Sequence, residues 1–206
     1  MTKLMIYGAT SYTGRMAAEH ARTAGTPLVL AGRNEAALSK LASELGVDYR
    51  VFGLDEPAEV DKGLAGITVL LKYAGPFVRT AEQLMTAAIR TGVHYLDTAP
   101  ELDSYRLAEV LDDEAKVAGI MLMPGGGGSV AMLGSLAGHA ATRVAKPFGI
   151  RVALHVSGAL SRGSAISAME NVATETLARV DGQLVAIRRP ASASSTSARA
   201  RSTVSL

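Results

Sequence analysis

Residues 3–14 read KLMIYGATSYTG, and this stretch decides the fold of the chain. A short apolar run ends at Gly8, and six further residues lead to Gly14 and a helix-like segment. A tight glycine turn between a buried strand and a helix presents main-chain N–H groups and the positive end of the helix dipole to an anion. At the first strand-to-helix connection of a chain, this pattern is typical of a dinucleotide-binding loop.

Strand-like and helix-like runs alternate from this loop to residue 123. The predicted strands are Lys3–Tyr7, Leu28–Ala31, Tyr49–Gly53, Val69–Tyr73, His94–Asp97 and Ile120–Met123. The predicted helices are Arg15–Ala24, Glu35–Leu45, Thr80–Thr91 and Leu102–Ala118. Asn34 is the expected N-cap of the second helix and Gly46 its expected end. The alternation predicts an α/β fold, a Rossmann-type doubly wound parallel sheet with helices on both faces.

The pattern changes after Met123, where the sequence PGGGG occupies residues 124–128. The later runs predict helices over Val130–Arg143 and Ala165–Arg179, a strand over Ile150–Ser157, and an Asp181-Gly182 hairpin between 177–180 and 183–187. We therefore expect a dinucleotide-binding domain over 1–124 and an incomplete α+β substrate or dimerisation domain over 125–189.

The last segment, 190–206, is rich in Ser, Ala, Arg and Thr and is expected to be a disordered tail. The abrupt change in composition after Ile187 suggests that the chain is truncated or that its reading frame shifts near Arg189.

Composition excludes several classes of function. The chain contains no Cys, so thiol nucleophiles and disulfides are excluded, and its 4 His are too widely spaced to predict a metal site. The net charge of +2 becomes −2 without the last nineteen residues, which carry four Arg and no acid, so the body has no basic face for nucleic acid. The uncharged run 117–142 is interrupted by Pro124 and glycines, which predicts no membrane span. The N-terminal apolar run ends at Gly8 and is too short for a signal peptide, so a cytoplasmic location is expected.

The loop residues are assigned separate roles at the cofactor. Gly8 allows the tight turn, Gly14 allows the helix to pack closely on the strand, and Ser11 replaces the middle glycine of the usual fingerprint. The Ser11 hydroxyl, like those of two neighbouring threonines, is able to donate to a phosphate oxygen. The residues expected at the cofactor in this loop are Gly8, Thr10, Ser11, Tyr12, Thr13 and Gly14.

Arg33 follows the second predicted strand, where an NAD-binding chain would have an acid on the ribose 2′-hydroxyl. A guanidinium there pairs with a 2′-phosphate, so Arg33, with no acid beside it, favours NADP. The alternative is a solvated Arg at a strand end. Asp55 after the third strand is a candidate acceptor for the adenine amino group, or an exposed turn residue.

Several motifs at strand ends resemble one family in the correct order. They are GATSYTG at 8–14, AGR at 31–33, YAGPF at 73–77, GVHYLD at 92–97 and PG at 124–125. With them, residues 1 to 188 resemble the saccharopine dehydrogenase-like NAD(P)-binding oxidoreductases, including trans-acting enoyl reductases. The resemblance implies a Rossmann domain followed by a substrate and dimerisation domain, through which two copies of the chain would form a homodimer. It also implies a total length well beyond that of this chain. The chain departs from the family pattern at Ser11, at Lys72-Tyr73 and at Pro100.

Ala74, Gly75 and Pro76 follow the fourth strand, at the edge where ligands bind in such sheets. Their small size suits close approach to the ribose and nicotinamide, and the alternative is a simple turn before a helix.

Three further residues are candidates for catalysis. Tyr95 and Asp97 point to one side of the fifth strand, where they are candidates to handle a proton, or else to fill the core and cap a helix. Lys72 is a cationic partner for the substrate or an exposed strand-end residue.

The sequence therefore predicts an NADP-dependent oxidoreductase that transfers hydride between nicotinamide and a small-molecule substrate with a C=N, C=O or C=C bond. The alternative is a protein that binds NADP without catalysis, as a sensor or an inactive truncated fragment. A residue positioned for proton transfer at the nicotinamide would separate the two.

Overall fold

The computed structural model describes residues 2–75, 77–146, 176–180 and 183–187. Contacts divide the chain into two compact units, Met1–Ala131 and Met132–Leu206. The first unit contains a parallel sheet and its helices, and the second contains a β-hairpin. The predicted domain boundary after residue 124 stays a prediction.

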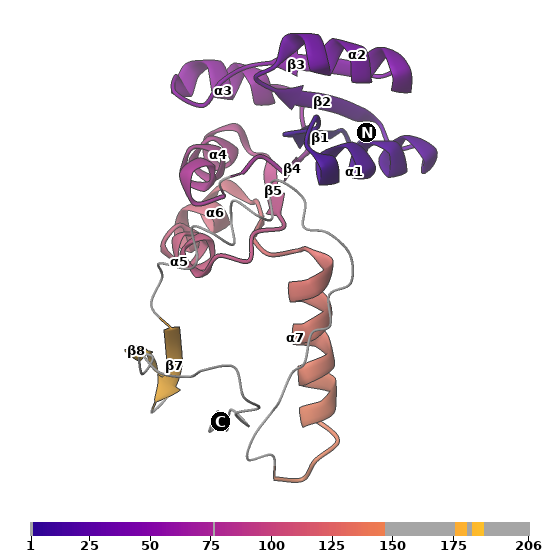
Figure 1. The fold of residues 1–206 in the computed structure, drawn as a ribbon. Helices are drawn as coiled ribbons and strands as arrows, with labels where there is room; N and C mark the ends of the chain where they lie inside the picture. The colour runs from indigo at the N-terminus through magenta and orange to yellow at the C-terminus, as the bar shows by residue number, and fades with distance from the viewer. Residues whose placement is uncertain (1, 76, 147–175, 181–182, 188–206) are drawn as a thin grey trace. The chain divides into compact units, whose positions relative to one another are not determined.

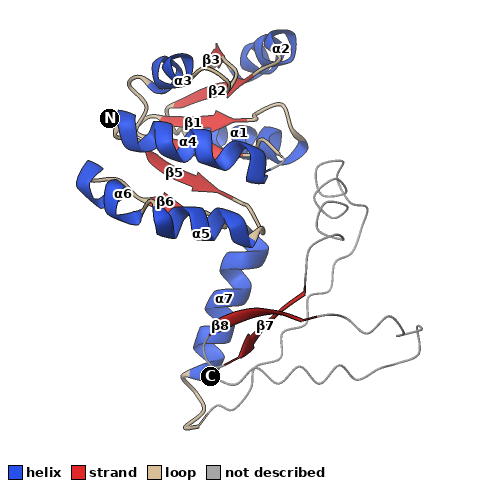
Figure 2. Ribbon diagram, turned by 90° about the vertical axis from the view of Figure 1, so that its left-hand side faces the viewer, coloured by secondary structure: helices blue, strands red, loops and turns tan. Residues whose placement is uncertain are grey.

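The sheet of the first unit has six parallel strands in the order β3-β2-β1-β4-β5-β6 (Figure 2). The strands are β1 (Leu4–Tyr7), β2 (Leu28–Gly32), β3 (Asp48–Val51), β4 (Val69–Lys72), β5 (His94–Asp97) and β6 (Leu122–Met123). The order reverses between β1 and β4, and ligands bind at such switch points, outside the carboxyl ends of the strands. The predicted Rossmann-type doubly wound sheet is confirmed.

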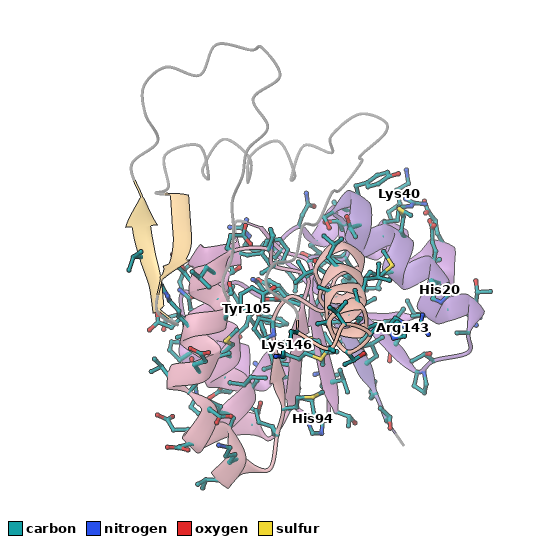
Figure 3. The ribbon with its side chains drawn as sticks, turned by 90° about the horizontal axis from the view of Figure 1, so that it is seen from below. His20, Lys40, His94, Tyr105, Arg143 and Lys146 are labelled. Atoms are coloured by element: carbon teal, nitrogen blue, oxygen red, sulfur yellow. The ribbon has the colours of Figure 1, made fainter. Side chains whose placement is uncertain are left out.

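Helices cover both faces of this sheet (Figure 1). They are α1 (Tyr12–Thr23), α2 (Glu35–Leu45), α3 (Pro57–Leu64), α4 (Phe77–Thr91), α5 (Leu102–Val110) and α6 (Asp112–Ala118); α7 (Gly128–Ala141) follows β6. Ala18 of α1 and Leu38 of α2 pack on one face, whereas Leu64 of α3 and Leu84 of α4 pack on the other. In Figure 3, His20 and Lys40 come from the layer of α1 and α2, and Tyr105 comes from the opposite layer.

Side-chain alternation in the strands builds the two cores. In β1, Met5 and Tyr7 enter the core beneath α3 and α4, while Ile6 enters the core beneath α1 and α2. Strands buried on both faces need a near-continuous apolar sequence, which β2 supplies as LVLAG. Each fully buried large apolar side chain contributes about 1.5–3 kcal/mol to folding.

The predicted boundaries of α2 are confirmed. The Asn34 side chain accepts a hydrogen bond from the Ala37 N–H at 3.1 Å, and Gly46 ends the helix at φ +64°. Asn and Gly are preferred at these two positions because the first satisfies a free N–H and the second adopts the left-handed conformation without strain. Local sequence therefore fixes this helix at both ends.

Other predicted helices differ from the observed ones. The run Leu102–Ala118 divides at Leu111 (φ −89°, ψ 2°) into α5 and α6, and α3, which begins at Pro57, was not among the predicted helices. The predicted helix Ala165–Arg179 is wrong over its last four residues, because β7 (Thr176–Val180) pairs antiparallel with β8 (Gln183–Ile187). That pairing confirms the predicted hairpin.

The predicted strand Ile150–Ser157 and the predicted tail 190–206 lie outside the described residues. Within the described part of the chain, no helix has both the length and the apolar character needed to cross a membrane.

Candidate functional site

The register of the central strands aligns the residues of the candidate site. Tyr7 at the end of β1 pairs with Ala31 of β2 on one side and with Lys72 of β4 on the other. Lys72 in turn pairs with Asp97 of β5. The carboxyl ends of four strands thus lie in one row, so the loops that follow them meet at one edge of the sheet.

The loop between β1 and α1 requires glycine at two positions. Gly8 has φ +85°, and a Cβ there would lie 2.5 Å from the Ala74 main-chain nitrogen. A Cβ on Gly14 would lie 2.3 Å from the Gly8 carbonyl oxygen. Both distances are well below van der Waals contact, so any side chain would push the loop away from β4 or from α1.

Ser11 is the N-cap of α1. Its hydroxyl oxygen accepts the Gly14 N–H at 3.1 Å, and its carbonyl accepts the Arg15 N–H at 2.8 Å. Among the described residues, the N–H groups of Tyr12 and Thr13 have no protein acceptor, as expected in the first turn of a helix. Free N–H groups at the positive end of a helix form an anion site, and the Ser11 hydroxyl hydrogen is still available to a phosphate.

A pocket of about 780 Å³ opens beside this loop. The predicted residues that line it are Gly8, Thr10, Ser11, Arg33, Ala74 and Gly75. The remaining predicted loop residues do not line it: Gly14 is buried beneath the loop, and Tyr12 is 72% exposed. Asp55 is also absent from the lining and lies in an exposed turn, while Pro76 lies outside the described residues.

Arg33 directly follows the carboxyl end of β2. Its side chain is exposed and has no ion-pair partner among the described residues. Burial raises the pKa of the neighbouring Tyr7 phenol, and the Arg33 charge partly opposes that rise. A free guanidinium at the rim of the pocket is suited to a phosphate.

Sequence reasoning missed five residues of the lining. They are Tyr7, Gly32, Asn34, Glu35 and Tyr73. Glu35 corrects the expectation that no acid stands near Arg33: it is the first residue of α2 and lines the same pocket. The signal was available, because the N-cap Asn34 places the next residue at the start of the helix, beside the end of β2.

Behind the pocket, the ends of β4 and β5 contain a buried polar cluster of Lys72, Tyr95 and Asp97. All three side chains are 0% exposed. Tyr95 donates to Asp97 Oδ2 at 2.6 Å, and the Lys72 ammonium lies 3.8 Å from the same oxygen. The expectation that Tyr95 and Asp97 share one side of the strand is confirmed, whereas the exposed strand-end alternative for Lys72 is wrong.

Asp97 also ties β5 to two loops. Its Oδ1 accepts the Ala99 N–H and the Gly125 N–H, both at 2.9 Å, and its carbonyl accepts the Gly126 N–H at 2.7 Å. The suggested cap of the following helix is wrong, because α5 begins at Leu102 and has no side-chain cap. The carboxylate instead holds the glycine-rich segment after β6 against β5.

Lys72 is held by α4 as well as by Asp97. Its ammonium donates to the Phe77 carbonyl at 3.2 Å and lies 4.3 Å from the centre of the Phe77 ring. Loss of hydration on burial lowers the pKa of Lys72 from 10.5 to about 8, although Asp97 and Glu101 oppose that effect. Burial, reinforced by the charge of Asp97, raises the pKa of Tyr95 well above its ordinary value.

The comparison with protein families identifies the first unit. Residues 4–123 match the family described as the saccharopine dehydrogenase NADP binding domain. The chain belongs to this family. This membership confirms the resemblance drawn from the sequence motifs and the predicted cofactor, NADP.

Individual relatives match the chain over shorter stretches. The trans-acting enoyl reductases of Mycobacterium leprae and Mycobacterium tuberculosis are 29% and 30% identical to it over 106 residues, which are 48% of this chain and 25% of each relative. The match thus spans about a quarter of these proteins.

The apo saccharopine dehydrogenase (L-Glu forming) of Saccharomyces cerevisiae has a similar fold, with a TM-score of 0.56 at 19% identity. The alignment covers 63% of this chain and 28% of that one. At this level of identity the likeness supports the fold alone.

Proposed function

We propose that the chain is the cofactor-binding part of an NADP-dependent oxidoreductase that transfers hydride between nicotinamide and a substrate with a C=N, C=O or C=C bond. One observation carries the proposal. In a member of an NADP-binding family, the glycine loop, the exposed Arg33 and the small residues Ala74 and Gly75 line one pocket at the switch point of the sheet.

The residues present fit a dinucleotide phosphate. Thr10, Ser11 and the free N–H groups at the start of α1 would hold the pyrophosphate, and Arg33 would hold the 2′-phosphate. The small Ala74 and Gly75 would allow the ribose and nicotinamide to approach the end of β4. A Cβ added to Gly75 would meet nothing within 4 Å, so this side of the pocket is open.

When bound, the cofactor supplies or accepts the hydride, and a proton must reach or leave the other atom of the reacting double bond. The candidates Tyr95, Asp97 and Lys72 do not line the pocket. We therefore place the proton donor outside this cluster, on residues 125–189, on a second copy of the chain or on solvent.

The same burial favours a second candidate function, NADP binding without catalysis. Among the described residues that line the pocket, Tyr7 and Tyr73 are acids whose pKa is raised by burial, and neither is poised to release a proton near neutral pH. A chain that binds NADPH, and for which no tested substrate leads to NADPH oxidation, would fit this alternative.

Titration with NADPH and NADH tests the cofactor assignment. A charge-assisted contact contributes about 1.5–3 kcal/mol, so Arg33→Ala is expected to weaken NADPH binding by about tenfold to a hundredfold and to change NADH little. Arg106→Ala, at an exposed site on α5, is the matched control. Equal affinities of the unchanged chain for the two cofactors would contradict the role of Arg33.

A substrate screen separates the two candidate functions. The chain is incubated with NADPH and a panel of imines, ketones and enoyl compounds, and loss of the reduced nicotinamide absorbance is followed. Oxidation with one class identifies the type of double bond. Tight NADPH binding with no oxidation across the panel would favour the binding protein.

A further inference from the structure

The Lys72 ammonium is linked through α4 to the wall of the nucleotide pocket. It donates to the Phe77 carbonyl, which also accepts the Thr80 hydroxyl at 3.4 Å. The same Thr80 hydroxyl also donates to the Ala74 carbonyl at 3.1 Å. Ala74 lines the pocket together with Tyr73 and Gly75. A continuous chain of contacts therefore joins a buried cation to the residues that face the cofactor.

This cation has unusual surroundings for a lysine at the end of a strand. Hydrogen bonding to Phe77 uses one of its three donors, and its closest anion, Asp97, is already bonded by Tyr95 and by two N–H groups. The Phe77 ring covers the ammonium at 4.3 Å. Among the described residues, the ammonium contacts the start of α4, which follows the Tyr73–Gly75 segment, through the carbonyl and the ring of Phe77.

We infer that Lys72 is a positioning residue for the cofactor, whose charged ammonium fixes Phe77 and, through it, the Tyr73–Gly75 wall in the shape that binds NADP. The inference rests on the NADP site proposed above. Lys72 does not itself touch the pocket, so it acts through the main chain.

The titratable and charged groups around Lys72 define what happens when it loses its proton. They come from three elements and one loop: Tyr7 of β1, Tyr95 and Asp97 of β5, Tyr105 of α5, and Glu101 before α5. Burial raises the pKa of each of these tyrosines, so Lys72 is the member of the group expected to titrate between neutral pH and pH 9. Its deprotonation removes the cation from the Phe77 ring and leaves two carboxylates without it.

Below the pKa of about 8 the ammonium is charged and holds Phe77, and above it the neutral amine does not attract the ring. NADPH binding is therefore expected to weaken as pH rises through about 8. A cation–π contact and a charged hydrogen bond together support a change of about tenfold in Kd.

The test is the Kd of the full chain for NADPH between about pH 7 and pH 9.5, a range in which the 2′-phosphate stays ionised. We expect a rise in Kd of about tenfold that begins near pH 8 and is largely complete about one pH unit higher. Lys72→Met is expected to bind with the alkaline Kd of the unchanged chain at every pH. Lys62→Met, at an exposed site on α3, is the control and should keep the rise in Kd with pH.

Two further measurements make the test independent of the folding of the variant. Thermodynamic linkage requires a tenfold effect to raise the pKa of Lys72 by about one unit when NADPH is bound, which NMR of its side-chain nitrogen measures in the unchanged chain. The step must also be equal for NADH and NADPH. A through-space attraction to the cofactor would instead be larger for NADPH, which has the additional phosphate charge.

The possible results separate the claims. A Kd for NADPH that does not change with pH, a step that survives in a folded Lys72→Met chain, or a step clearly larger for NADPH than for NADH overturns the inference alone. A chain that binds NADPH at no pH overturns the proposed function, and the inference with it.

Discussion

The two halves of the candidate site are built in different ways. At the β1–α1 loop, main-chain N–H groups and small residues form the proposed binding surface, and the N–H groups of Tyr12 and Thr13 have no acceptor within the part of the chain that the structure describes. At the ends of β4 and β5, side chains form a buried cluster. In this cluster the Asp97 carboxylate accepts three hydrogen bonds and has no contact with solvent. The first region is prepared for a ligand, and the second is largely satisfied by the protein itself.

This difference suggests that recognition of the ligand and stability of the fold depend on different residues. Unsatisfied donors at a helix N-terminus have a use only when an anion binds, so they mark the recognition surface. Satisfied buried charges hold elements in place, and removing one partner is costly because the other stays buried without compensation. The β4–β5 cluster is accordingly expected to control stability and shape, and the loop to control affinity.

Asp97→Ala is the variant expected to have the largest effect. It removes the anion beside the Lys72 ammonium and leaves the Tyr95 hydroxyl and two N–H groups without their acceptor, so the free energy of unfolding should fall by about 3–5 kcal/mol. Urea denaturation measures this change. Asp103→Ala, which breaks an exposed pair with Arg106 at 3.7 Å, should cost less than about 1 kcal/mol. Similar costs for the two variants would mean that the cluster does not hold β5.

The pH dependence of stability isolates the cost of burying Lys72. Because its pKa is lowered from 10.5 to about 8 in the folded chain, the unfolded chain binds more protons between these values, and stability rises with pH there. The full effect is about 3 kcal/mol. It is measured as the unfolding free energy of the unchanged chain minus that of Lys72→Met across this range. A difference that stays constant or falls would contradict the burial of a titrating ammonium.

Two glycines with positive φ provide a matched pair for the loop. A Cβ on Gly8 would collide with the Ala74 main chain at 2.5 Å, whereas a Cβ on Gly25 at φ +71° would meet nothing within 4 Å. Gly25→Ala should therefore cost only the conformational strain of about 1–2 kcal/mol and leave NADPH binding intact. Gly8→Ala should cost about 1 kcal/mol more and abolish NADPH binding. Equal binding by the two variants would show that the loop tolerates displacement from β4.

Variants of Ser11 separate its capping role from its proposed phosphate contact. Ser11→Asp keeps a good N-cap but places a negative charge beside the pyrophosphate, so it should lose most NADPH affinity at nearly unchanged stability. Ser11→Gly keeps both the cap preference and close approach, and should lose little of either. Ser11→Ala should lose about 1 kcal/mol of stability and about tenfold in affinity. Normal NADPH binding by Ser11→Asp would place the phosphates elsewhere.

The sequence predicted the loop region better than the cluster because local signals determine the loop. The tight turn at Gly8, the close packing at Gly14 and the Asn34 cap are each signalled by residue type at one position, and the structure confirms these backbone roles. Lys72 was misjudged because a lysine at a strand end is usually exposed. Only the pairing of β4 with β5, together with the return of Phe77 over the ammonium, shows that it is buried.

The break between α5 and α6 was missed for a related reason. The apolar spacing continues across Leu111, and no Gly or Pro in the sequence marks the non-helical backbone conformation that this residue adopts. Packing against the sheet decides such a break, as tertiary contacts commonly override helix propensity.

Amide chemical shifts of the chain during NADPH titration test the central claim most directly, that one NADP site joins the glycine loop, Arg33 and the end of β4. The account predicts that amides of Gly8–Gly14, Gly32–Asn34 and Tyr73–Gly75 shift together with a single Kd. It also predicts that amides around a second pocket, at Thr26 and Val47, near the opposite ends of the strands, do not shift. Shifts confined to that second pocket, or a glycine loop unaffected at saturating NADPH, would contradict it.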